Sequence, residues 1–500
     1  MSIHFLLLYS CFIQFVWGQL PPYTGQFGVG TIDIEVPINP RNISNYTFEE
    51  TGEPVFLLET VLFSTYYPID SDIESSHPQR PWIPRPLDLV AEGLSVYVNS
   101  SNSSISTDFL TTAIQSLAGS INISAIVDAP ILDSAAPFPV LVFSHGDVAL
   151  RAWYSQFCGD LASHGFVVAA VEHRDGSAAA TQVRRSDGTT KNVTYLLPDT
   201  ISSVTNVTDI TLAQRDFRQA EVVEVIKVLQ NITSGEGTAI RSANTRDEGE
   251  TLDGWNGRLD LSTLLVGGHS FGAASALQTL SEAPNGTVPA QGAILLDPGK
   301  QSGPLNTDVH IPILMADSEE WSSIPFNFYG REHFDVLKDI AEDAPDETGG
   351  GWFMTLLGTA HTTITDPSFL GGQFSAFFAN PEFNATLNSS DALAQYIRVS
   401  TEFFHLVKNG TKDGVLAAEV THPNFNEANE TAVDDTDQNI TRYWEIHVAP
   451  DSSQSETNDT EPEDSPNDTD NEDEEGDAMR HVVQYVNILV MSLICIFINL

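Results

Sequence analysis

The chain has 500 residues, of which 41% are apolar and 18% are charged, so most of it can fold around a large core. Its formal net charge is −46, which argues against nucleic acid as a partner, because phosphate binding needs clustered Lys and Arg. The length alone allows two or three domains, whereas the order of elements described below favours one.

The first 18 residues are predicted to be a secretory signal peptide. Residues 5–15 form a short apolar run, and the segment that follows allows cleavage after Gly18. The basic residues that usually precede such a run are absent, and the alternative is a buried N-terminal helix. Many Asn-x-Ser/Thr sequons also favour passage through the secretory pathway, and they mark surface positions. The candidate glycosylation sites are Asn42, Asn45, Asn99, Asn102, Asn122, Asn192, Asn206, Asn231, Asn285, Asn384, Asn388, Asn409, Asn429, Asn439, Asn458 and Asn467.

One α/β domain is predicted between residues 19 and 448. Continuous apolar runs, typical of strands buried on both faces, alternate with segments of helical periodicity. The strands are predicted at residues 138–144, 166–172, 261–266, 293–296, 311–315 and 352–357. The helices are predicted at residues 153–163, 212–229, 271–280 and 393–407, the last ending at Gly410. This alternation predicts a mostly parallel sheet with helices on both faces. Residues 182–211 and 230–256 are predicted to be polar, glycosylated surface insertions.

The C-terminal end is predicted to lie outside the folded domain. Residues 449–477 hold thirteen Asp and Glu and no Lys or Arg, which predicts a disordered acidic linker. Residues 478–500 end in an apolar run that is short for a membrane span of about 20 residues, and they resemble a GPI-attachment signal. A retained transmembrane tail is the alternative. Cys11 and Cys495 lie in the segments predicted to be removed, so Cys158 is predicted to be an unpaired core residue.

The candidate nucleophile is Ser270, in the segment Gly268-His269-Ser270-Phe271-Gly272. A Gly-x-Ser-x-Gly turn between a strand and a helix raises the serine hydroxyl above the edge of a sheet, and the tight turn needs small residues on both sides. An apolar strand precedes this turn and a helix rich in small residues follows it. The sequence therefore predicts an α/β-hydrolase fold with its nucleophile elbow at Ser270.

A serine hydroxyl needs a base, and in this fold the triad histidine comes late in the chain. His361 is the best placed candidate, because it lies in a loop directly after the predicted strand 352–357. His269 neighbours the serine but is predicted to point away from it and to be structural. His333 and His405 lie on predicted helices and are interpreted as surface or packing residues.

Two aspartates are candidates for the acid that orients the imidazole. Asp297 ends the strand after the nucleophile strand, and Asp317 ends the next one. Both would lie at the same edge of a parallel sheet as Ser270. Position alone does not separate them.

Several segments resemble the secreted, plasma-type platelet-activating factor acetylhydrolases. They are Phe143-Ser144-His145-Gly146, the segment from Asp160 to Phe166, Val171-Glu172-His173-Arg174-Asp175, the elbow at Ser270, and Gln278-Thr279-Leu280-Ser281. The resemblance is strong over residues 136–181 and 261–300, weaker to about residue 375, and absent from the insertions and the last hundred residues. It implies an α/β-hydrolase in which the acid is Asp297 and the base is His361.

The resemblance also implies an oxyanion hole made by the main-chain N–H groups of Phe271 and Asp147. The family usually has an apolar residue where Asp147 stands, so this carboxylate is expected to turn away or to pair, with Arg151 as one candidate partner. The alternative interpretation of His145, His173 and Arg174 as a metal or phosphate site is less favoured than a role in holding the oxyanion turn. No zinc-ligand spacing such as His-Glu-x-x-His is present, which predicts metal independence. No cofactor is expected.

The leading hypothesis is a secreted, calcium-independent serine carboxylester hydrolase. As the resemblance implies, its substrates would be glycerophosphocholines that carry an acetyl or a short or oxidised acyl group at sn-2, with membrane association through the C-terminal anchor. A broader secreted esterase or lipase for other short-chain esters is the second hypothesis. The third is a non-catalytic surface protein on the same fold, which the glycosylation sites and the acidic segment would also fit.

Overall fold

A computed structural model describes residues 19–73, 78–100, 104–204, 206–284, 287–345, 349–370, 380 and 383–450 of this chain. The predicted signal peptide, nearly all of the acidic segment and the C-terminal tail lie outside the described residues, as do Asn102, Asn285, Asn458 and Asn467. In the part of the chain that is described, no helix has both the length and the apolar character that a membrane span needs.

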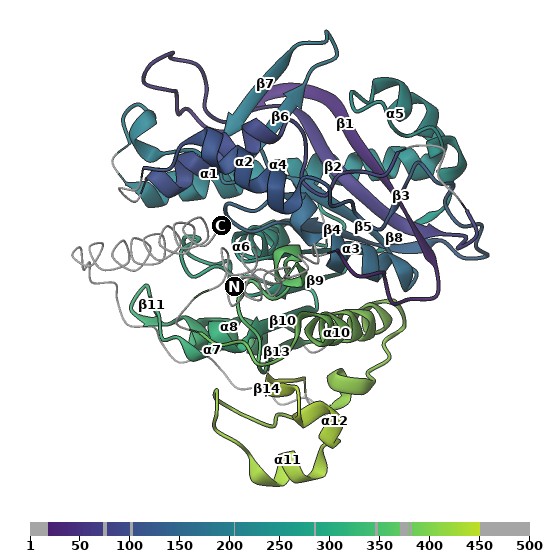
Figure 1. The fold of residues 1–500 in the computed structure, drawn as a ribbon. Helices are drawn as coiled ribbons and strands as arrows, with labels where there is room; N and C mark the ends of the chain where they lie inside the picture. Colours follow the sequence, from purple (N-terminus) through teal and green to yellow (C-terminus); the bar gives the residue numbers. More distant parts are fainter. Residues whose placement is uncertain are drawn as a thin grey trace, which may run out of the picture.

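A large central sheet organises the described residues (Figure 1). Its strand order is β14-β13-β10-β9-β8-β4-β5-β2-β1-β3, and the six strands from β13 to β5 run parallel to one another. These six are β4 (Phe138–Ser144), β5 (Val167–Glu172), β8 (Leu259–His269), β9 (Gly292–Leu296), β10 (Ile313–Ser318) and β13 (Gly351–Leu356). Each of these strands overlaps one of the apolar runs identified in the sequence. The predicted parallel sheet of an α/β-hydrolase is therefore confirmed.

The edges of the sheet were not predicted. β1 (Gly28–Asn42) and β2 (Leu57–Ile69) pair antiparallel with each other, and β2 pairs antiparallel with β5. β3 (Ile126–Val127) pairs parallel with β1, and β14 (Trp444–Val448) pairs antiparallel with β13. β1 contains acidic residues, Asp33 and Glu35, which break an apolar pattern. Glu35 is nevertheless fully buried because arginines from distant segments pair with it. A local pattern therefore misses this strand.

Helices cover both faces of the sheet, as predicted (Figure 1). α4 (Val207–Asn231), α6 (Phe271–Thr279) and α8 (His333–Glu342) share one hydrophobic core with the sheet. α1 (Leu87–Asn99), α2 (Thr107–Ala118), α3 (Ser155–Ser163) and α10 (Ser389–Asn409) share the core on the other face. Gly410 ends α10 in the left-handed conformation, at φ 73°, which confirms the predicted stop. Cys158 is buried in α3, as predicted.

Shorter elements occupy the connections. They are the hairpins β6 (Ala180–Arg184) with β7 (Thr190–Thr194) and β11 (Asn327–Phe328) with β12 (Arg331–Glu332), and the helices α5 (Gly237–Ala243), α7 (Glu319–Ser323), α11 (Glu430–Asp435) and α12 (Gln438–Thr441). The prediction that residues 230–256 form a polar surface insertion is wrong in part. Ile232, Leu252 and Trp255 are fully buried in the core shared by α4 and α6, because these apolar side chains pack into that core.

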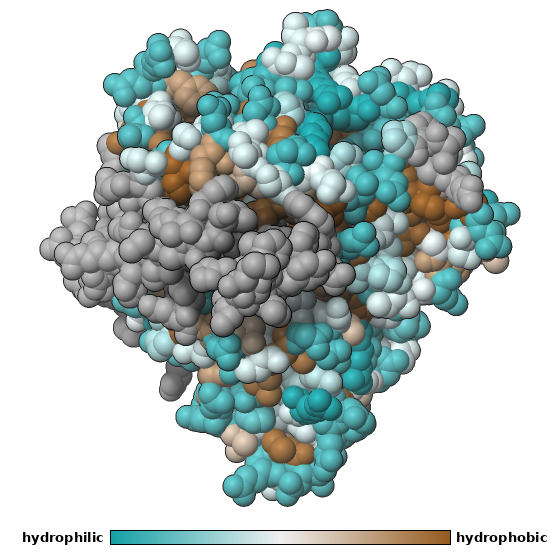
Figure 2. Space-filling view, in the orientation of Figure 1, coloured by the Kyte–Doolittle hydropathy of each residue, from teal (hydrophilic) through white to brown (hydrophobic). Residues whose placement is uncertain are grey.

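The surface seen in Figure 2 is mostly hydrophilic, with apolar side chains exposed in small areas. Among the described residues, the large hydrophobic side chains that reach solvent are Val207, Leu212, Ile324 and Tyr329. The described candidate glycosylation sites are exposed, except for Asn206, which is half-buried. Their positions are compatible with modification, which stays a prediction.

Candidate active site

Ser270 lies in the sharp turn between β8 and α6. Its backbone has φ 56° and ψ −123°, a conformation that side-chain-bearing residues rarely adopt. The flanking glycines are needed for space: a Cβ on Gly272 would lie 2.1 Å from the carbonyl oxygen of Ser144, and one on Gly268 would lie 2.4 Å from the carbonyl carbon of Gly272. The Ser270 N–H donates to Leu296 O at 2.9 Å, which ties the turn to β9. The sequence pattern therefore has a steric cause.

The strain at this turn leads to a stability prediction. Ser270→Gly is expected to raise the free energy of unfolding by roughly 1 kcal/mol relative to Ser270→Ala, because glycine adopts positive φ without a clash and this gain exceeds its greater entropy loss on folding. Thermal and urea unfolding of the two variants measure the difference. Ser281, in the 3-10 turn Leu280–Glu282 after α6, is the control: there glycine is expected to be less stable than alanine. Equal stability of the two Ser270 variants would contradict strain.

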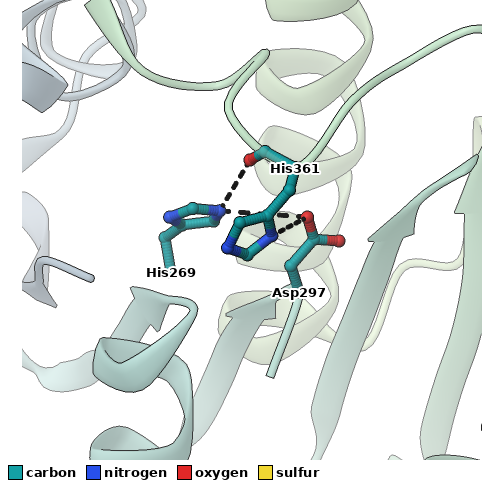
Figure 3. A group of neighbouring side chains, drawn as sticks. All are labelled: His269, Asp297 and His361. Carbon is teal, nitrogen blue, oxygen red and sulfur yellow. Dashed lines mark hydrogen bonds and ion pairs between the residues drawn. The ribbon is translucent and has the colours of Figure 1, made fainter. Parts of the chain in front are cut away.

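The structure brings Ser270, His361 and Asp297 into one hydrogen-bonded row. His361 Nε2 lies 3.1 Å from Ser270 Oγ, and His361 Nδ1 lies 2.8 Å from Asp297 Oδ2. Figure 3 shows the imidazole of His361 turned toward the carboxylate of Asp297. Because an ionised carboxylate can only accept, Nδ1 carries the proton and Nε2 offers its lone pair to the serine hydroxyl. This arrangement allows proton transfer from Ser270 to His361.

Three sheet strands deliver these side chains to one edge. Ser270 follows β8, Asp297 follows the neighbouring strand β9, and His361 lies in the loop after β13. The carboxyl ends of parallel strands meet at this edge, which is where open α/β sheets bind ligands. The His361 N–H donates to Glu320 Oε2 at 2.8 Å, and this bond holds the loop against α7.

The geometry separates the two candidate acids. Asp297 is buried and also accepts from the hydroxyl of Ser318 at 2.8 Å. Burial opposes its ionisation, but the imidazole of His269 at 3.8 Å and the hydrogen-bonded imidazole of His361 hold its pKa well below the usual range. Burial raises the pKa of Asp317 well above its usual value, and the charge of Asp297 adds to this effect. Asp297 bonds to His361, and no bond joins Asp317 to His361 among the described residues.

Two aromatic side chains next to His361 were not assigned to the site from sequence. Trp321 stacks on the imidazole, with ring centroids 3.8 Å apart and planes at 12°, and its Nε1–H donates to Pro298 O. The ring of His269 lies 4.5 Å from that of His361, and its Nε2 lies 3.0 Å from His361 O. His269 was predicted to be structural, and this contact gives it a partner in the site. No sequence pattern around Trp321, on the short helix α7 after β10, indicates that this residue belongs to the site.

His269, Asp297 and His361 also offer three possible metal-ligand atoms within 4.8 Å of one another (Figure 3). His361 Nδ1 already donates to Asp297, and His269 Nε2 already donates to the carbonyl oxygen of His361. A cation there would have to displace two protons and break the row that ends at Ser270. The donor set therefore fits a hydrogen-bonded triad better than a metal site.

The segment His145-Gly146-Asp147-Val148, here called the oxyanion loop, faces the nucleophile. A Cβ on Gly146 would lie 3.2 Å from Ser270 Cβ. The main-chain N–H groups of Asp147 and Phe271, the two predicted oxyanion donors, have no hydrogen-bond acceptor among the residues that the structure describes. Free N–H groups on two sides of a serine hydroxyl can bind a developing negative charge.

The side chain of Asp147 has a different partner from the one suggested. Its carboxylate lies 3.3 Å from the hydroxyl of Tyr195, at the end of the β6–β7 hairpin. Arg151 pairs instead with Asp33 and Glu172 in a buried network. The suggested pairing of Asp147 with Arg151 is therefore wrong, because nearer carboxylates on β1 and β5 occupy the guanidinium.

His145, His173 and Arg174 lie behind the oxyanion loop, in agreement with a supporting role. His145 Nδ1 donates to Gly146 O at 2.8 Å, and His145 Nε2 accepts from the N–H of His173. Burial, with the nearby charge of Arg218, lowers the pKa of both histidines well below the usual value, so both are neutral. Arg174 pairs with Glu35. The guanidinium of Arg218, missed from sequence, donates to His145 O at 2.6 Å and lies over the Phe271 ring.

The remaining histidine interpretations hold. His333 begins α8 as a buried packing residue against Phe328, and His405 is exposed on α10. Neither lies in the row of Ser270, His361 and Asp297.

Known proteins agree with this architecture. The chain is 30% identical to a platelet-activating factor acetylhydrolase of Cavia porcellus over 61% of each chain, and 30% identical to that of Bos taurus over 53% of this chain and 52% of the relative. It is 28% identical to a putative phospholipase A2 of Schizosaccharomyces pombe over 51% of this chain and 58% of the relative. These matches therefore span about half to three-fifths of the relatives' length.

A solved structure and a family model extend the comparison. A ferulic acid esterase from Streptomyces cinnamoneus shares the fold, with a TM-score of 0.51 and 18% identity over 81% of this chain and 96% of the esterase. The model of the family "Platelet-activating factor acetylhydrolase, isoform II" matches residues 13–418, which reaches further toward the C-terminus than the resemblance seen in the sequence. With the elbow at Ser270 and this match over most of its length, the chain belongs to the platelet-activating factor acetylhydrolase family.

Proposed function

We propose that this chain is a secreted serine carboxylester hydrolase that removes an acetyl or a short or oxidised acyl group from the sn-2 position of glycerophosphocholines. The observation that supports the proposal most directly is the imidazole of His361, placed between the hydroxyl of Ser270 and the carboxylate of Asp297. In this proposal Ser270 is the nucleophile, His361 the general base and acid, and Asp297 the orienting acid.

The first half-reaction forms an acyl-enzyme. Ser270 Oγ bonds to the ester carbonyl carbon while its proton moves to His361 Nε2, and the carbonyl electron pair moves onto oxygen. The N–H groups of Phe271 and Asp147 bind that oxyanion, each donor typically contributing a few kcal/mol. The oxyanion then collapses, the bond to the leaving alkoxide breaks, and His361 returns its proton to that oxygen. A lysophospholipid leaves.

The second half-reaction restores the serine. His361 removes a proton from water, the hydroxide oxygen bonds to the acyl carbon, and the acyl–Ser270 bond breaks with the proton returning to Oγ. In both halves the imidazolium carries a positive charge for part of the step. The ionised carboxylate of Asp297 at 2.8 Å stabilises that charge, and the face of Trp321 at 3.8 Å adds a cation–π attraction.

Family membership and surface chemistry support a lipid substrate. Two exposed apolar side chains, Ile324 and Leu212, flank the loop after Asp297. From this loop, Lys300 Nζ donates to the main-chain oxygen of Ile324, and Gly303 lies against Leu212. Exposed apolar side chains next to an active site suit a substrate with alkyl chains. The Asp147 carboxylate near Tyr195, where the family usually has an apolar residue, favours a second candidate, a broader esterase for other short-chain esters.

Two measurements test the proposal. A fluorophosphonate probe is expected to label the wild-type protein and not Ser270→Ala, because the probe needs only an activated serine. The absence of labelling in the wild type would favour a non-catalytic surface protein.

A series of sn-2 acyl lengths on phosphocholine, compared with p-nitrophenyl esters of the same lengths, then separates the two enzymatic candidates. A preference for phosphocholines with two-carbon chains supports the leading one, and equal rates for both substrate types support the broader esterase.

Metal independence and cellular location are parts of the same proposal. Activity is expected to be unchanged by calcium chelation, because no step described above needs a cation. Exposed sequons and the N-terminal apolar run support export and glycosylation. Release of the protein from cells by a phosphatidylinositol-specific phospholipase would support the lipid anchor, and retention of the protein on treated cells would count against it.

A further inference from the structure

We propose that Tyr154 and His269 are positioning residues that join the oxyanion loop to the main chain of His361 through one directed chain of hydrogen bonds. The inference rests on the proposed function, because it assigns these side chains a role in keeping two parts of that site in register. Tyr154 lies in the short 3-10 helix Arg151–Tyr154 before α3, and His269 is the last residue of β8.

The chain of bonds has three links. The Gly146 N–H donates to Tyr154 Oη at 3.1 Å. Tyr154 Oη lies 2.8 Å from His269 Nδ1. His269 Nε2 lies 3.0 Å from the carbonyl oxygen of His361. The links connect the loop that carries one oxyanion donor to the residue that carries the base.

The donors and acceptors of these three hydrogen bonds can be assigned in only one way. A peptide N–H can only donate and a peptide carbonyl can only accept, so the two ends of the chain are fixed. His269 must therefore place its proton on Nε2, and Tyr154 must donate to the bare Nδ1. Burial, with the neighbouring His361, lowers the pKa of His269 to about 4, so the neutral ring that this direction requires is present above that pH. Hydrogen bonds that point the same way polarise and strengthen one another.

At the first end, the chain fixes the oxyanion loop. Tyr154 receives the N–H of the peptide between His145 and Gly146, and Arg218 donates to the C=O of that same peptide. The next peptide is held by His145 Nδ1, which donates to Gly146 O. Because a trans peptide is planar, a fixed Gly146 C=O directs the Asp147 N–H to the opposite side. Tyr154 therefore helps to set where the proposed oxyanion donor points.

At the other end, the chain fixes the base. His269 holds the C=O of His361, and Glu320 holds its N–H at 2.8 Å. Tyr154 and His269 are both almost completely buried, so water does not replace a lost partner there. Removing the Tyr154 hydroxyl would leave the Gly146 N–H unpaired and would allow the His269 proton to move to Nδ1, which removes the donor to His361 O. One deletion would then disturb both ends.

The first experiment compares Tyr154→Phe with Tyr67→Phe. Tyr67 is a matched control, because it is equally buried and its hydroxyl donates to Ala129 O at 2.7 Å, in a different part of the molecule. Both variants are expected to lose similar thermal stability. Only Tyr154→Phe is expected to lower kcat, by about 10- to 100-fold with KM changed less than threefold, since small displacements of catalytic groups cost rates of this size. Activity of Tyr154→Phe within twofold of Tyr67→Phe would overturn the inference.

A double-mutant cycle tests whether the two side chains act as one chain. His269→Gln keeps a donor near His361 O and removes the ring acceptor for Tyr154. If the links are coupled, adding Tyr154→Phe to His269→Gln should cost at least fivefold less in kcat than it costs in the wild type. Multiplicative losses within twofold would overturn the coupling.

A measurement independent of activity separates this inference from the proposed function. The imidazole ¹⁵N shifts of His269 at pH 7 are expected to show a protonated Nε2 and a bare Nδ1 in the wild type. A protonated Nδ1 would overturn the chain of bonds whatever the activity. Failure of the fluorophosphonate probe to label Ser270, with the expected tautomer present, would instead refute the proposed function and leave the hydrogen-bond chain as a structural feature.

Discussion

Ser270→Ala is expected to lower kcat/KM for a short-chain phosphocholine ester by roughly four to six orders of magnitude, because no other side chain can take the place of the hydroxyl that His361 activates. The Ser270 hydroxyl lies 3.1 Å from His361 Nε2, and the removal of one oxygen atom leaves the turn and its main-chain hydrogen bond to Leu296 in place. Steady-state hydrolysis and fluorophosphonate labelling both measure the loss.

The control for this prediction is a serine beyond the opposite end of the same helix, in the 3-10 turn that follows α6. Ser281 is exposed, and its hydroxyl donates to Gln278 O within the last turn, away from the triad. Ser281→Ala should retain full activity and full labelling. A Ser270→Ala protein that hydrolyses the ester within tenfold of the wild type would place the reacting group elsewhere.

The second large effect separates two buried aspartates. Asp297→Asn is expected to lower kcat by about 10⁴-fold, because an amide in place of the carboxylate favours the wrong imidazole tautomer and does not stabilise the imidazolium. Asp317→Asn is expected to lower kcat by less than about tenfold, since burial raises the pKa of Asp317 and so favours its neutral carboxyl, which asparagine resembles in shape and charge. Rates at one pH between 7 and 8 decide between them.

The two variants control for each other. Both residues are buried at the ends of neighbouring strands, β9 and β10, so a general disturbance of this sheet edge would lower both activities alike. Equal stabilities with unequal rates would support the role of Asp297. A greater loss in Asp317→Asn would make Asp317 the orienting acid and would require the loop of His361 to move.

Trp321 and Arg218 show how function at this site depends on distant segments. Trp321 comes from the short helix after β10 and stacks on His361, and Arg218 comes from α4 and contacts both sides of the proposed oxyanion hole. Neither residue type is unusual in its own segment. Each acquires its role from the side chain that the fold places beside it.

The parallel strands and the elbow could be predicted because their causes are local. A strand buried on both faces must be apolar over its whole length, and a turn as tight as that at Ser270 excludes any Cβ at Gly268 and Gly272. The same locality made α10 and its stop at Gly410 predictable. His361 could be selected because the loop after an apolar strand must open at the edge of the sheet where Ser270 lies.

The edge strands, the choice between the acids and the surroundings of the imidazole depended on contacts between distant segments. No local sequence pattern identifies β1, because the buried carboxylate of Glu35 is stabilised by arginines that are more than a hundred residues away in the chain. Asp297 and Asp317 have the same position relative to their strands. They differ because the carboxylate of Asp297 points toward His361 and bonds to it. The sequence by itself determined which residues could react, and the tertiary structure decided which of them meet, because hydrogen bonding and burial act between side chains that the order of the chain does not place together.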